Sequence, residues 1–582
     1  MIFYYFCPPV LNRIITVLKK DKNKKLEKMT QKSKLTIPSL INESVKKYAD
    51  KTSVVFVGEE NYTYEQLGND VDRVASLLLK LGVQKGDKVA ILSTNMPNWG
   101  VAFFGISKIG AIAVPILPDF HENEIKTIVK HSEANILFVS EGLYKYVSGE
   151  TLKLVNQVIL VDSFAVVPGG AKQEDLLTLK SSLPSAKADF SAIEVEEEDL
   201  ASIIYTSGTT GNSKGVMLTH KNLAWTAQQC YSLQEIKSDD RFISILPLSH
   251  TLENTVGFLL PLKYGASVHY LRKPPVASVL MPALQEVKPT IMLIVPLIIE
   301  KVFRVKILPE LQKSPVTRFL YSVSPFRKIL HKVAASKLHK SFGGHLRFFG
   351  IGGAKLDPTV ERFLSEGKFP YAIGYGLTET SPLLAGAVVG KTKLGSTGVA
   401  VEGVQLRIAD ADPITGEGEI QAKGPNVMRG YYKAPESTKE VFTEDGWFKT
   451  GDRGMFDKSN LLYIKGRIKT MIVGASGENI YPEEIESVIN KMRFVLESLV
   501  IEKKGKLVAM IHLNAEEIEQ NFKHLKAEAQ QYFHEKSEEI LKEIHKKVNE
   551  EVNKFSRIQQ VIMQPMPFEK TPTKKIKRFL YA

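Results

Sequence analysis

The stretch Tyr205-Thr-Ser-Gly-Thr-Thr-Gly-Asn-Ser-Lys-Gly215 follows directly on the apolar run Ala201-Ser-Ile-Ile204. Its glycines let backbone N–H groups approach an anion, its hydroxyls add donors or a magnesium ligand, and Lys214 adds a positive charge. The spacing differs from G-x-x-x-x-G-K-[ST], because only two residues separate Gly211 from Lys214 and Gly215 follows the lysine. The stretch predicts a phosphate-binding turn after a buried strand; a generic hydrophilic loop is the alternative.

The pattern on either side of this turn predicts an α/β fold. Short apolar runs alternate with helical patterns across residues 36–465, which favours parallel sheets covered by helices. A shorter strand meander is expected at 395–465, and a small α+β region begins at 466. The clearest predicted strands are 88–93, 134–139, 157–161, 290–295 and 506–513. The clearest predicted helices are 64–81, 122–131, 482–490 and 534–554, with additional helical length at 515–535.

Size and composition are those of an ordinary globular protein. The chain has 582 residues, 43% hydrophobic and 24% charged, which predicts two to four domains. Its two cysteines, Cys7 and Cys230, exclude a disulfide framework and fit a reducing cytoplasm.

The net charge of +13 is concentrated in two segments. Residues 12–34 carry nine Lys/Arg and two acids, and residues 298–347 carry eleven Lys/Arg and two acids. No nucleic-acid-binding module accompanies them, so anionic lipid is the better partner, with peripheral contact at the inner membrane face. Within 324–340, Phe326, Ile329, Leu330 and Val333 recur at helical spacing between basic residues. The alternatives are a solvated surface and an amphipathic helix packed on its own domain.

The first 35 residues form a basic N-terminal extension. Its apolar segment 2–18 is interrupted by Pro8, Pro9 and Arg13 and is too short to span a bilayer. An interfacial anchor and a translated leader ending before Met29 both remain open.

Six further segments accompany the turn in a fixed order. They are Leu246-Pro-Leu-Ser-His-Thr-Leu-Glu253, Gly350-Ile-Gly-Gly-Ala-Lys355, Gly374-Tyr-Gly-Leu-Thr-Glu-Thr380, Gly446-Trp-Phe-Lys-Thr-Gly-Asp452, Gly466-Arg-Ile-Lys-Thr-Met-Ile472 and Thr571-Pro-Thr-Lys-Lys-Ile-Lys577. Together with the turn, they resemble the motifs of the adenylate-forming, AMP-binding superfamily, and most of all its long-chain acyl-CoA synthetases. The resemblance implies an AMP-binding domain over 36–465 with helix-covered sheets and a small β-barrel-like subdomain. It also implies a mobile C-terminal lid domain over 466–582.

The family reaction implies roles for the motif residues. A carboxylate attacks the α-phosphorus of ATP, and a thiol then attacks the acyl-adenylate. The residues implied for the β- and γ-phosphates are Thr206, Ser207, Gly208, Thr209, Thr210, Gly211 and Lys214. Thr209 and Glu379 would hold Mg²⁺, and Thr378 and Glu379 are implied as catalytic. The residues implied for the adenosine part are Gly353, Ala354, Tyr375, Gly376, Asp452 and Arg467, with Asp452 on the ribose.

Three further residues have implied roles. Lys575 would stabilise the adenylation transition state, although Lys574 is adjacent and a merely basic tail is the alternative. Lys469 occupies the hinge position between the two domains. His250 is expected near the acyl carboxylate, and a hydrogen-bonded structural histidine is almost as well supported.

The resemblance favours a ligase that joins a medium- to long-chain fatty acid to CoA, with ATP as co-substrate. One alternative uses an acyl carrier protein as the thiol, and another is a non-catalytic acyl- or nucleotide-binding homologue. The presence of Lys214, Glu379, Asp452 and Lys575 disfavours the last. The oligomeric state stays open.

Overall fold

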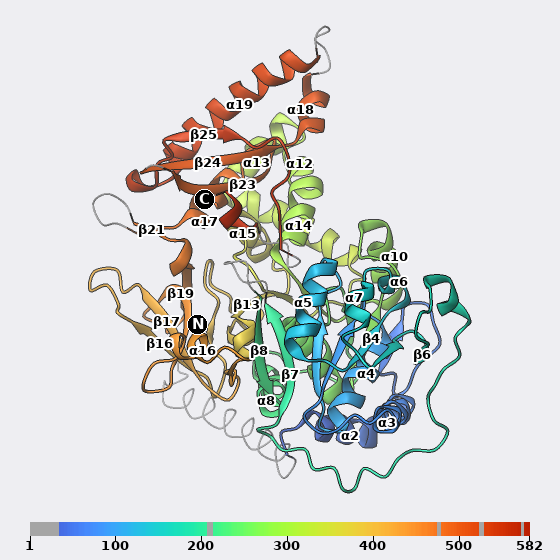
Figure 1. Cartoon of the computed structure of the whole chain (residues 1–582). Helices are drawn as coiled ribbons and strands as arrows, with labels where there is room; N and C mark the ends of the chain where they lie inside the picture. The colour runs from blue at the N-terminus through green and yellow to red at the C-terminus, as the bar shows by residue number, and fades with distance from the viewer. Residues whose placement is uncertain are drawn as a thin grey trace, which may run out of the picture.

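The computed structural model describes residues 34–206, 213–473, 479–503, 505–522, 529–571 and 576–581. Two eight-stranded sheets form the body, a four-stranded sheet lies beside them, and a C-terminal α+β unit stands above (Figure 1). The α/β fold class expected from the sequence is therefore confirmed. The division at residue 466 stays a prediction.

The first sheet is parallel at its centre and antiparallel at both ends. In spatial order its strands are β18 (Gly430–Tyr431), β8 (Lys214–Thr219), β7 (Leu200–Thr206), β3 (Ile112–Ile116), β2 (Lys88–Leu92), β4 (Ile136–Val139), β5 (Gln157–Leu160) and β6 (Val166–Val167). β7 and β8 are the two arms of a hairpin in which Thr206 is the register partner of Lys214.

The second sheet is parallel from β1 to β13 and ends in two antiparallel strands. In spatial order its strands are β1 (Val54–Phe56), β10 (Ser267–Tyr270), β9 (Arg241–Ser244), β11 (Ile291–Ile294), β12 (Phe348–Ile351), β13 (Tyr371–Gly376), β14 (Leu383–Gly386) and β15 (Val399–Ala400).

Helix α4 (Pro97–Lys108) joins the two sheets. It contacts β1 of the second sheet and β2 and β3 of the first. Its middle is apolar on every side, as expected for a helix enclosed by protein. Trp99, Phe103 and Phe104 are fully buried, and all three rings contact Phe258 or one another. This aromatic cluster fixes the sheets relative to each other.

The remaining helices cover the sheets, project from the body or belong to the C-terminal unit. They are α2 (Ile37–Tyr48), α3 (Tyr64–Lys80), α5 (Glu122–Ser132), α6 (Glu141–Tyr144), α7 (Gly149–Leu152), α8 (His220–Gln229), α9 (Leu260–Lys263), α10 (Ala277–Val287), α11 (Pro296–Val302), α12 (Leu308–Leu311), α13 (Pro315–Ser322), α14 (Ser324–Ser341), α15 (Pro358–Glu366), α16 (Pro435–Glu440), α17 (Pro482–Ile489), α18 (Ala515–Phe522) and α19 (Ala529–Glu551). α3 begins at a capping box in which Thr63 and Gln66 each satisfy the other's backbone N–H.

The third sheet is antiparallel, in the order β16 (Gln405–Ala409), β17 (Gly418–Lys423), β19 (Phe448–Phe456), β20 (Leu462–Arg467). Its end strands β16 and β20 do not pair with each other among the described residues, so this sheet is open. The expectation of a barrel-like subdomain is corrected to this extent. A closed barrel needs pairing between the end strands, which the meander pattern alone does not specify.

The C-terminal unit packs α17 and α19 on a three-stranded sheet of β23 (Val495–Lys503), β24 (Lys506–Leu513) and β25 (Gln560–Met563). A two-stranded ribbon, β21 (Ile472–Val473) with β22 (Asn479–Ile480), precedes it. The predicted strand 506–513 is confirmed residue for residue. No helix in the described ranges is long and apolar enough to cross a membrane.

Candidate active site

Asp452 is the centre of a hydrogen-bonded cluster between the second and third sheets. The hydroxyl of Tyr375, at the end of β13, donates to Asp452 Oδ2 at 2.7 Å. Arg467 Nε lies 2.7 Å from Asp452 Oδ1, because the two residues are register partners on β19 and β20. Burial raises the pKa of Tyr375, and the nearby carboxylate of Asp452 raises it further. The Tyr375 hydroxyl therefore stays protonated and donates to a buried carboxylate. A carboxylate in this position can accept hydrogen bonds from a ribose diol.

A second cluster surrounds the ring of Tyr431 on β18. The Tyr431 hydroxyl donates to Glu379 Oε1 at 2.9 Å. Lys214 Nζ lies 4.8 Å from the centroid of the same ring. Glu379 belongs to the short helix η5 (Thr378–Thr380), which is tied to β18 because the N–H of Met428 donates to the Glu379 carbonyl at 2.8 Å. Strand β8 and the short helix η5 therefore contribute a lysine and a carboxylate to one ring.

Arg467 brings the two clusters into electrostatic contact. Burial raises the pKa of Tyr431, Glu379 adds to the rise, and the guanidinium of Arg467 opposes it. The carboxylates of Asp452 and Glu379 are thus neighbours of a single cation. Such an arrangement suits a polyanionic nucleotide with a bound divalent cation.

The loop after β12 lies beside these clusters, since β12 and β13 are parallel neighbours. Gly353 and Ala354 are exposed there, and Gly353 has a positive φ of 88°. Gly376 ends β13, and a Cβ at that position would lie 1.7 Å from the carbonyl oxygen of Pro382. Only glycine allows β13 and the chain after η5 to approach so closely.

His250 and Lys469 do not belong to either cluster. His250 Nδ1 accepts from the N–H of Leu252 at 3.2 Å, at the start of the π-helix η3 (Leu252–Leu259). That contact is typical of a structural histidine. Lys469 is exposed in η6 (Ile468–Thr470), directly after β20. Residues 207–211 and Lys575, all assigned roles from the sequence, lie outside the described residues, whereas Thr206 and Lys214 flank the turn.

Sequence reasoning missed two groups. Tyr431 contacts both Lys214 and Glu379, but its position depends on pairing between β18 and β8 across more than 200 residues of sequence. Glu253 is fully enclosed on η3, accepts from Ser244 Oγ at 2.6 Å, and burial raises the pKa of its carboxyl to about 8. The motif 246–253 contained Glu253, yet nothing local indicated that its side chain is buried.

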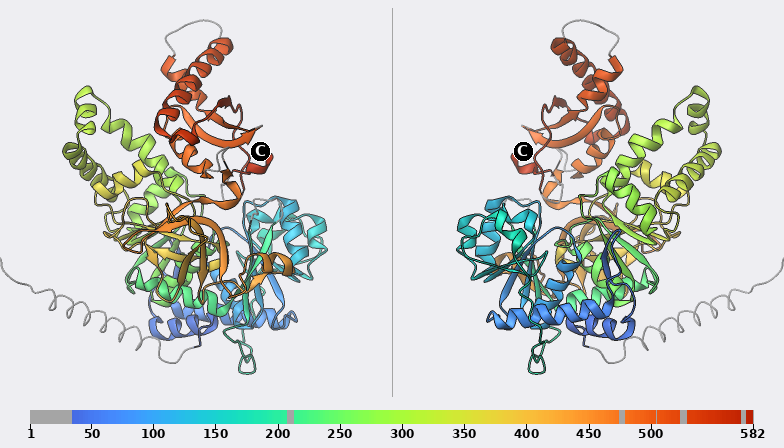
Figure 2. Two further views of the ribbon diagram at one scale, coloured as in Figure 1. Left: turned by 90° about the vertical axis from the view of Figure 1, so that its left-hand side faces the viewer. Right: turned by 90° about the vertical axis from the view of Figure 1, so that its right-hand side faces the viewer.

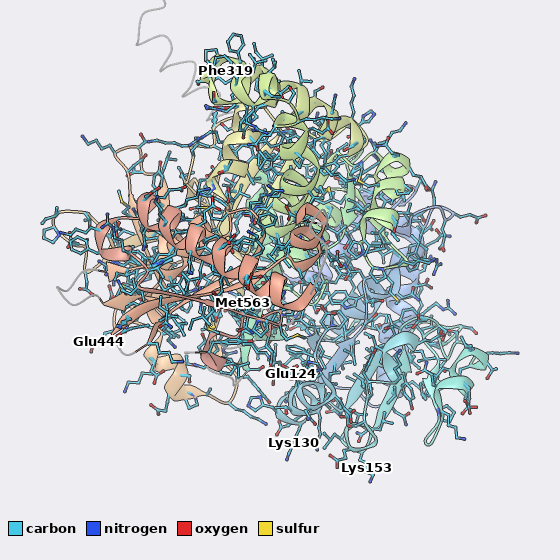
Figure 3. The ribbon with its side chains drawn as sticks, turned by 90° about the horizontal axis from the view of Figure 1, so that it is seen from above. Glu124, Lys130, Lys153, Phe319, Glu444 and Met563 are labelled. Carbon is cyan, nitrogen blue, oxygen red and sulfur yellow. The ribbon has the colours of Figure 1, made fainter. Side chains whose placement is uncertain are left out.

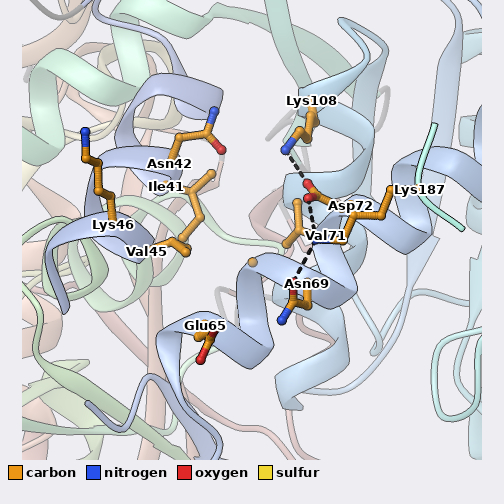
Figure 4. Close-up of a pocket in the computed structure, with 11 residues that line it drawn as sticks. Ile41, Asn42, Val45, Lys46, Glu65, Asn69, Val71, Asp72, Lys108 and Lys187 are labelled. Atoms are coloured by element: carbon orange, nitrogen blue, oxygen red, sulfur yellow. Dashed lines mark hydrogen bonds and ion pairs between the residues drawn. The ribbon is translucent and has the colours of Figure 1, made fainter. Parts of the chain in front are cut away.

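A hollow of about 290 Å³ lies away from these clusters, between α2 and α3 (Figure 4). Asp72 stands between two lysines there. Lys108 pairs with it, Lys187 Nζ lies 3.0 Å from its Oδ2, and Lys187 also donates to Asn69 Oδ1 at 2.7 Å. Lys108 and Lys187 therefore already have partners, and none of the residues assigned to the nucleotide lines this hollow.

The fold and the two clusters are those of a nucleotide-dependent ligase class, and comparison with known proteins agrees. The AMP-binding enzyme profile matches residues 41–432, so the chain belongs to the AMP-binding enzyme family. The resemblance to adenylate-forming enzymes is confirmed.

Two relatives and one solved structure show what the chain is similar to. The chain is 28% identical to a chloroplastic long-chain-fatty-acid–[acyl-carrier-protein] ligase of Arabidopsis thaliana, over 93% of this chain and 84% of that protein. It is 28% identical to a long-chain-fatty-acid–CoA ligase of Rattus norvegicus, over 82% and 76%. Among solved structures, ATP-bound MatB from Rhodopseudomonas palustris superposes with a TM-score of 0.72 at 25% identity, over 94% of this chain and 98% of that one.

Proposed function

We propose that this protein activates a medium- to long-chain fatty acid with ATP and transfers the acyl group to the thiol of CoA. In the first step a carboxylate oxygen bonds to the α-phosphorus and pyrophosphate leaves. In the second step the CoA sulfur bonds to the acyl carbon and AMP leaves. The observation that carries this proposal is the adjacency of the Asp452 cluster to the Lys214–Tyr431–Glu379 cluster.

The chain's residues have distinct tasks in this scheme. Asp452 binds the ribose diol, and Tyr375 presents its ring to adenine beside Gly353 and Ala354. Lys214 pairs with phosphate oxygens. Lys575 neutralises charge at the α-phosphate during the first step only, as the resemblance implies. Each group acts mainly by holding two anions together in an in-line geometry.

Magnesium fits the donor groups on the phosphate side. Glu379 Oε1 is engaged by Tyr431, and Oε2 has no hydrogen-bond partner in the described part of the chain. One carboxylate oxygen from Glu379 and, as the resemblance implies, the hydroxyl of Thr209 would supply the hard oxygen ligands that Mg²⁺ prefers. When bound, the ion neutralises phosphate charge.

An acyl carrier protein as thiol acceptor is the second candidate. The plant relative that spans 93% of this chain is named for that reaction, which is the specific observation in its favour.

One assay separates the candidates. Purified protein is given palmitate, ATP and magnesium with either CoA or carrier protein, and AMP and thioester are both measured. We expect both AMP and thioester only with CoA, because AMP leaves only when a thiol attacks the acyl carbon. Thioester only with carrier protein would move the assignment to the second candidate. Absence of AMP with any acid from medium to long chain would reject both and support a non-catalytic binding protein.

A further inference from the structure

Helices α13 and α14 form a projecting hairpin, residues 315–341. Both views of Figure 2 show it standing out from the body beside the C-terminal unit. α13 has no buried residue, and the buried residues of the hairpin lie on α14, which also contacts α15 and α10. There Arg327 makes a two-pronged ion pair with Glu366 of α15, and Gln285 of α10 donates to the carbonyl oxygens of Lys340 and Ser341 at 3.0 and 2.7 Å.

Three of the four apolar side chains that suggested a packed amphipathic helix face outward instead, and Leu330 is half-buried. α14 buries His331, Ala335 and Leu338. Phe326, Ile329 and Val333 share another face, and at 100° per residue that face is roughly opposite to the buried one. They are 47%, 58% and 52% exposed. The sequence alternative of a helix whose apolar stripe packs on its own domain is therefore wrong for these three residues.

Helix α13 also exposes large apolar side chains. Val316 is 67% exposed and Phe319 is 66% exposed. Figure 3 places Phe319 at the edge of the molecule opposite to Lys130 and Lys153. Five large apolar side chains on one hairpin are more than the scattered exposure that a monomeric surface usually shows.

The hairpin is also strongly basic. Residues 315–341 contain six Lys/Arg and no Asp or Glu. Five of these cations have no carboxylate partner among the described residues: Arg318, Lys328, Lys332, Lys337 and Lys340. A basic face interleaved with exposed aromatic and aliphatic side chains is the combination that binds at the headgroup boundary of an anionic bilayer.

We propose that this hairpin docks the protein peripherally on an anionic lipid bilayer, with the five apolar side chains in the interface and the five cations among the headgroups. An acidic protein partner would use the charges but would have to match every apolar side chain with a specific pocket. A bilayer accepts them in any arrangement, so the exposed apolar set favours lipid. Docking requires neither turnover nor nucleotide, so it stands apart from the proposed ligase reaction.

Co-sedimentation of the full-length protein with vesicles tests the charge contribution. Binding is compared on phosphatidylcholine alone and on phosphatidylcholine mixed with phosphatidylglycerol, at low and high salt. We expect binding to the anionic vesicles only, weakened by salt. The triple variant Lys328→Gln, Lys332→Gln, Lys337→Gln should bind about 100-fold more weakly, at about fivefold per cation.

A second triple variant tests the apolar contribution. Phe319→Ser, Phe326→Ser and Ile329→Ser should lower vesicle affinity by at least roughly tenfold, because their insertion into the interface is lost. All three side chains are exposed, so the thermal midpoint should stay unchanged. Retention of anionic-vesicle binding by either variant overturns the proposal, as does equal binding to both vesicle types or to neither.

A matched control removes three exposed lysines elsewhere. Lys130→Gln, Lys145→Gln and Lys153→Gln lower the net charge by the same amount as the hairpin triple. The control should keep the affinity of the parent protein. An equal loss in the control would mean that total charge, rather than the hairpin, governs binding, which also overturns the proposal.

Discussion

At the scale of single residues, Asp452 has both carboxylate oxygens engaged by protein groups before any nucleotide arrives. Asp452→Ala should weaken ATP binding by roughly 3 kcal/mol, because charge-assisted hydrogen bonds to the ribose are lost. Tyr375→Phe, which keeps the ring and the carboxylate, should cost only about 1 kcal/mol. Titration calorimetry with ATP measures both. Parent-like affinity in the alanine variant would remove Asp452 from the ribose site.

Tyr431 offers a sharper test of the phosphate side. Tyr431→Phe keeps the ring near Lys214 but removes the donor to Glu379, so the carboxylate loses its orientation. We expect the magnesium concentration for half-maximal AMP formation to rise roughly tenfold. Tyr432→Phe is the matched control, because the Tyr432 hydroxyl donates at the surface to Glu133 at 3.2 Å. Equal behaviour of the two variants would contradict the role given to Tyr431.

Glu253 makes stability depend on pH. Burial raises the pKa of its carboxyl from 4.5 to about 8 in the folded protein, and the hydrogen bond from Ser244 opposes the rise. The folded state therefore holds a proton that the unfolded state releases. The contribution of Glu253 to the free energy of unfolding is fully present below about pH 4.5. It falls by up to about 1.4 kcal/mol per pH unit as the pH rises toward 8. Glu253→Gln should remove this fall. The measurement is the thermal midpoint of both proteins between pH 5 and pH 8.5. A difference between the two midpoints that is the same at every pH would mean that Glu253 does not titrate in this range.

At the scale of elements, the junction of β13 with η5 depends on Gly376. Gly376→Ala would place a Cβ against the Pro382 carbonyl, so β13 or the chain carrying Glu379 must move. We expect a loss of roughly 1–3 kcal/mol in stability together with loss of adenylation. Gly142→Ala is the control, because a Cβ there meets nothing within 4 Å, and its stability should stay within about 0.5 kcal/mol of the parent. Chemical denaturation measures both, and a neutral Gly376 variant would contradict the close approach.

Some of the helices and strands could be predicted from the sequence, and others could not. Apolar runs with clear turn residues predicted β2, β5, β11 and β24 to within a residue or so, because their local pattern and their buried position agree. The motif residues Tyr375 and Asp452, both assigned to the adenosine part of ATP by the family resemblance, form a hydrogen bond with each other. Tyr431 and the open third sheet depend instead on which distant strands pair. The outward face of α14 depends on which side of the helix meets α15, and no local periodicity decides that.

At the scale of the whole molecule, several polar contacts between described residues join the C-terminal unit to the body. Arg304 donates to the carbonyl of Asn490, Lys355 Nζ lies 3.4 Å from Glu484, and Tyr481 donates to Glu417 at 3.2 Å. Contacts of this kind are typical of units that change orientation.

If the C-terminal unit changes orientation between the two half-reactions, one substitution should be able to block the first without blocking the second. Lys575→Ala should abolish acyl-adenylate formation while sparing thioester formation from preformed adenylate, because Lys575 serves only the first step. Rapid-quench measurement of each step with supplied intermediate provides the comparison. Equal loss in both steps would mean that another lysine is responsible or that the variant is misfolded.

The ion pair between Arg467 and Asp452 has a thermodynamic consequence. β20 ends at Arg467, so the strand that leads into the C-terminal unit carries the cation that holds the Asp452 carboxylate. The proposed ribose role of Asp452 and the proposed reorientation of the C-terminal unit would make ligand occupancy and the angle of that unit linked variables. Linkage is reciprocal: any factor by which the angle changes ATP affinity is the factor by which ATP shifts the populations of the two angles. A ribose-bearing ligand without an acyl group should therefore bias the orientation of the C-terminal unit by itself.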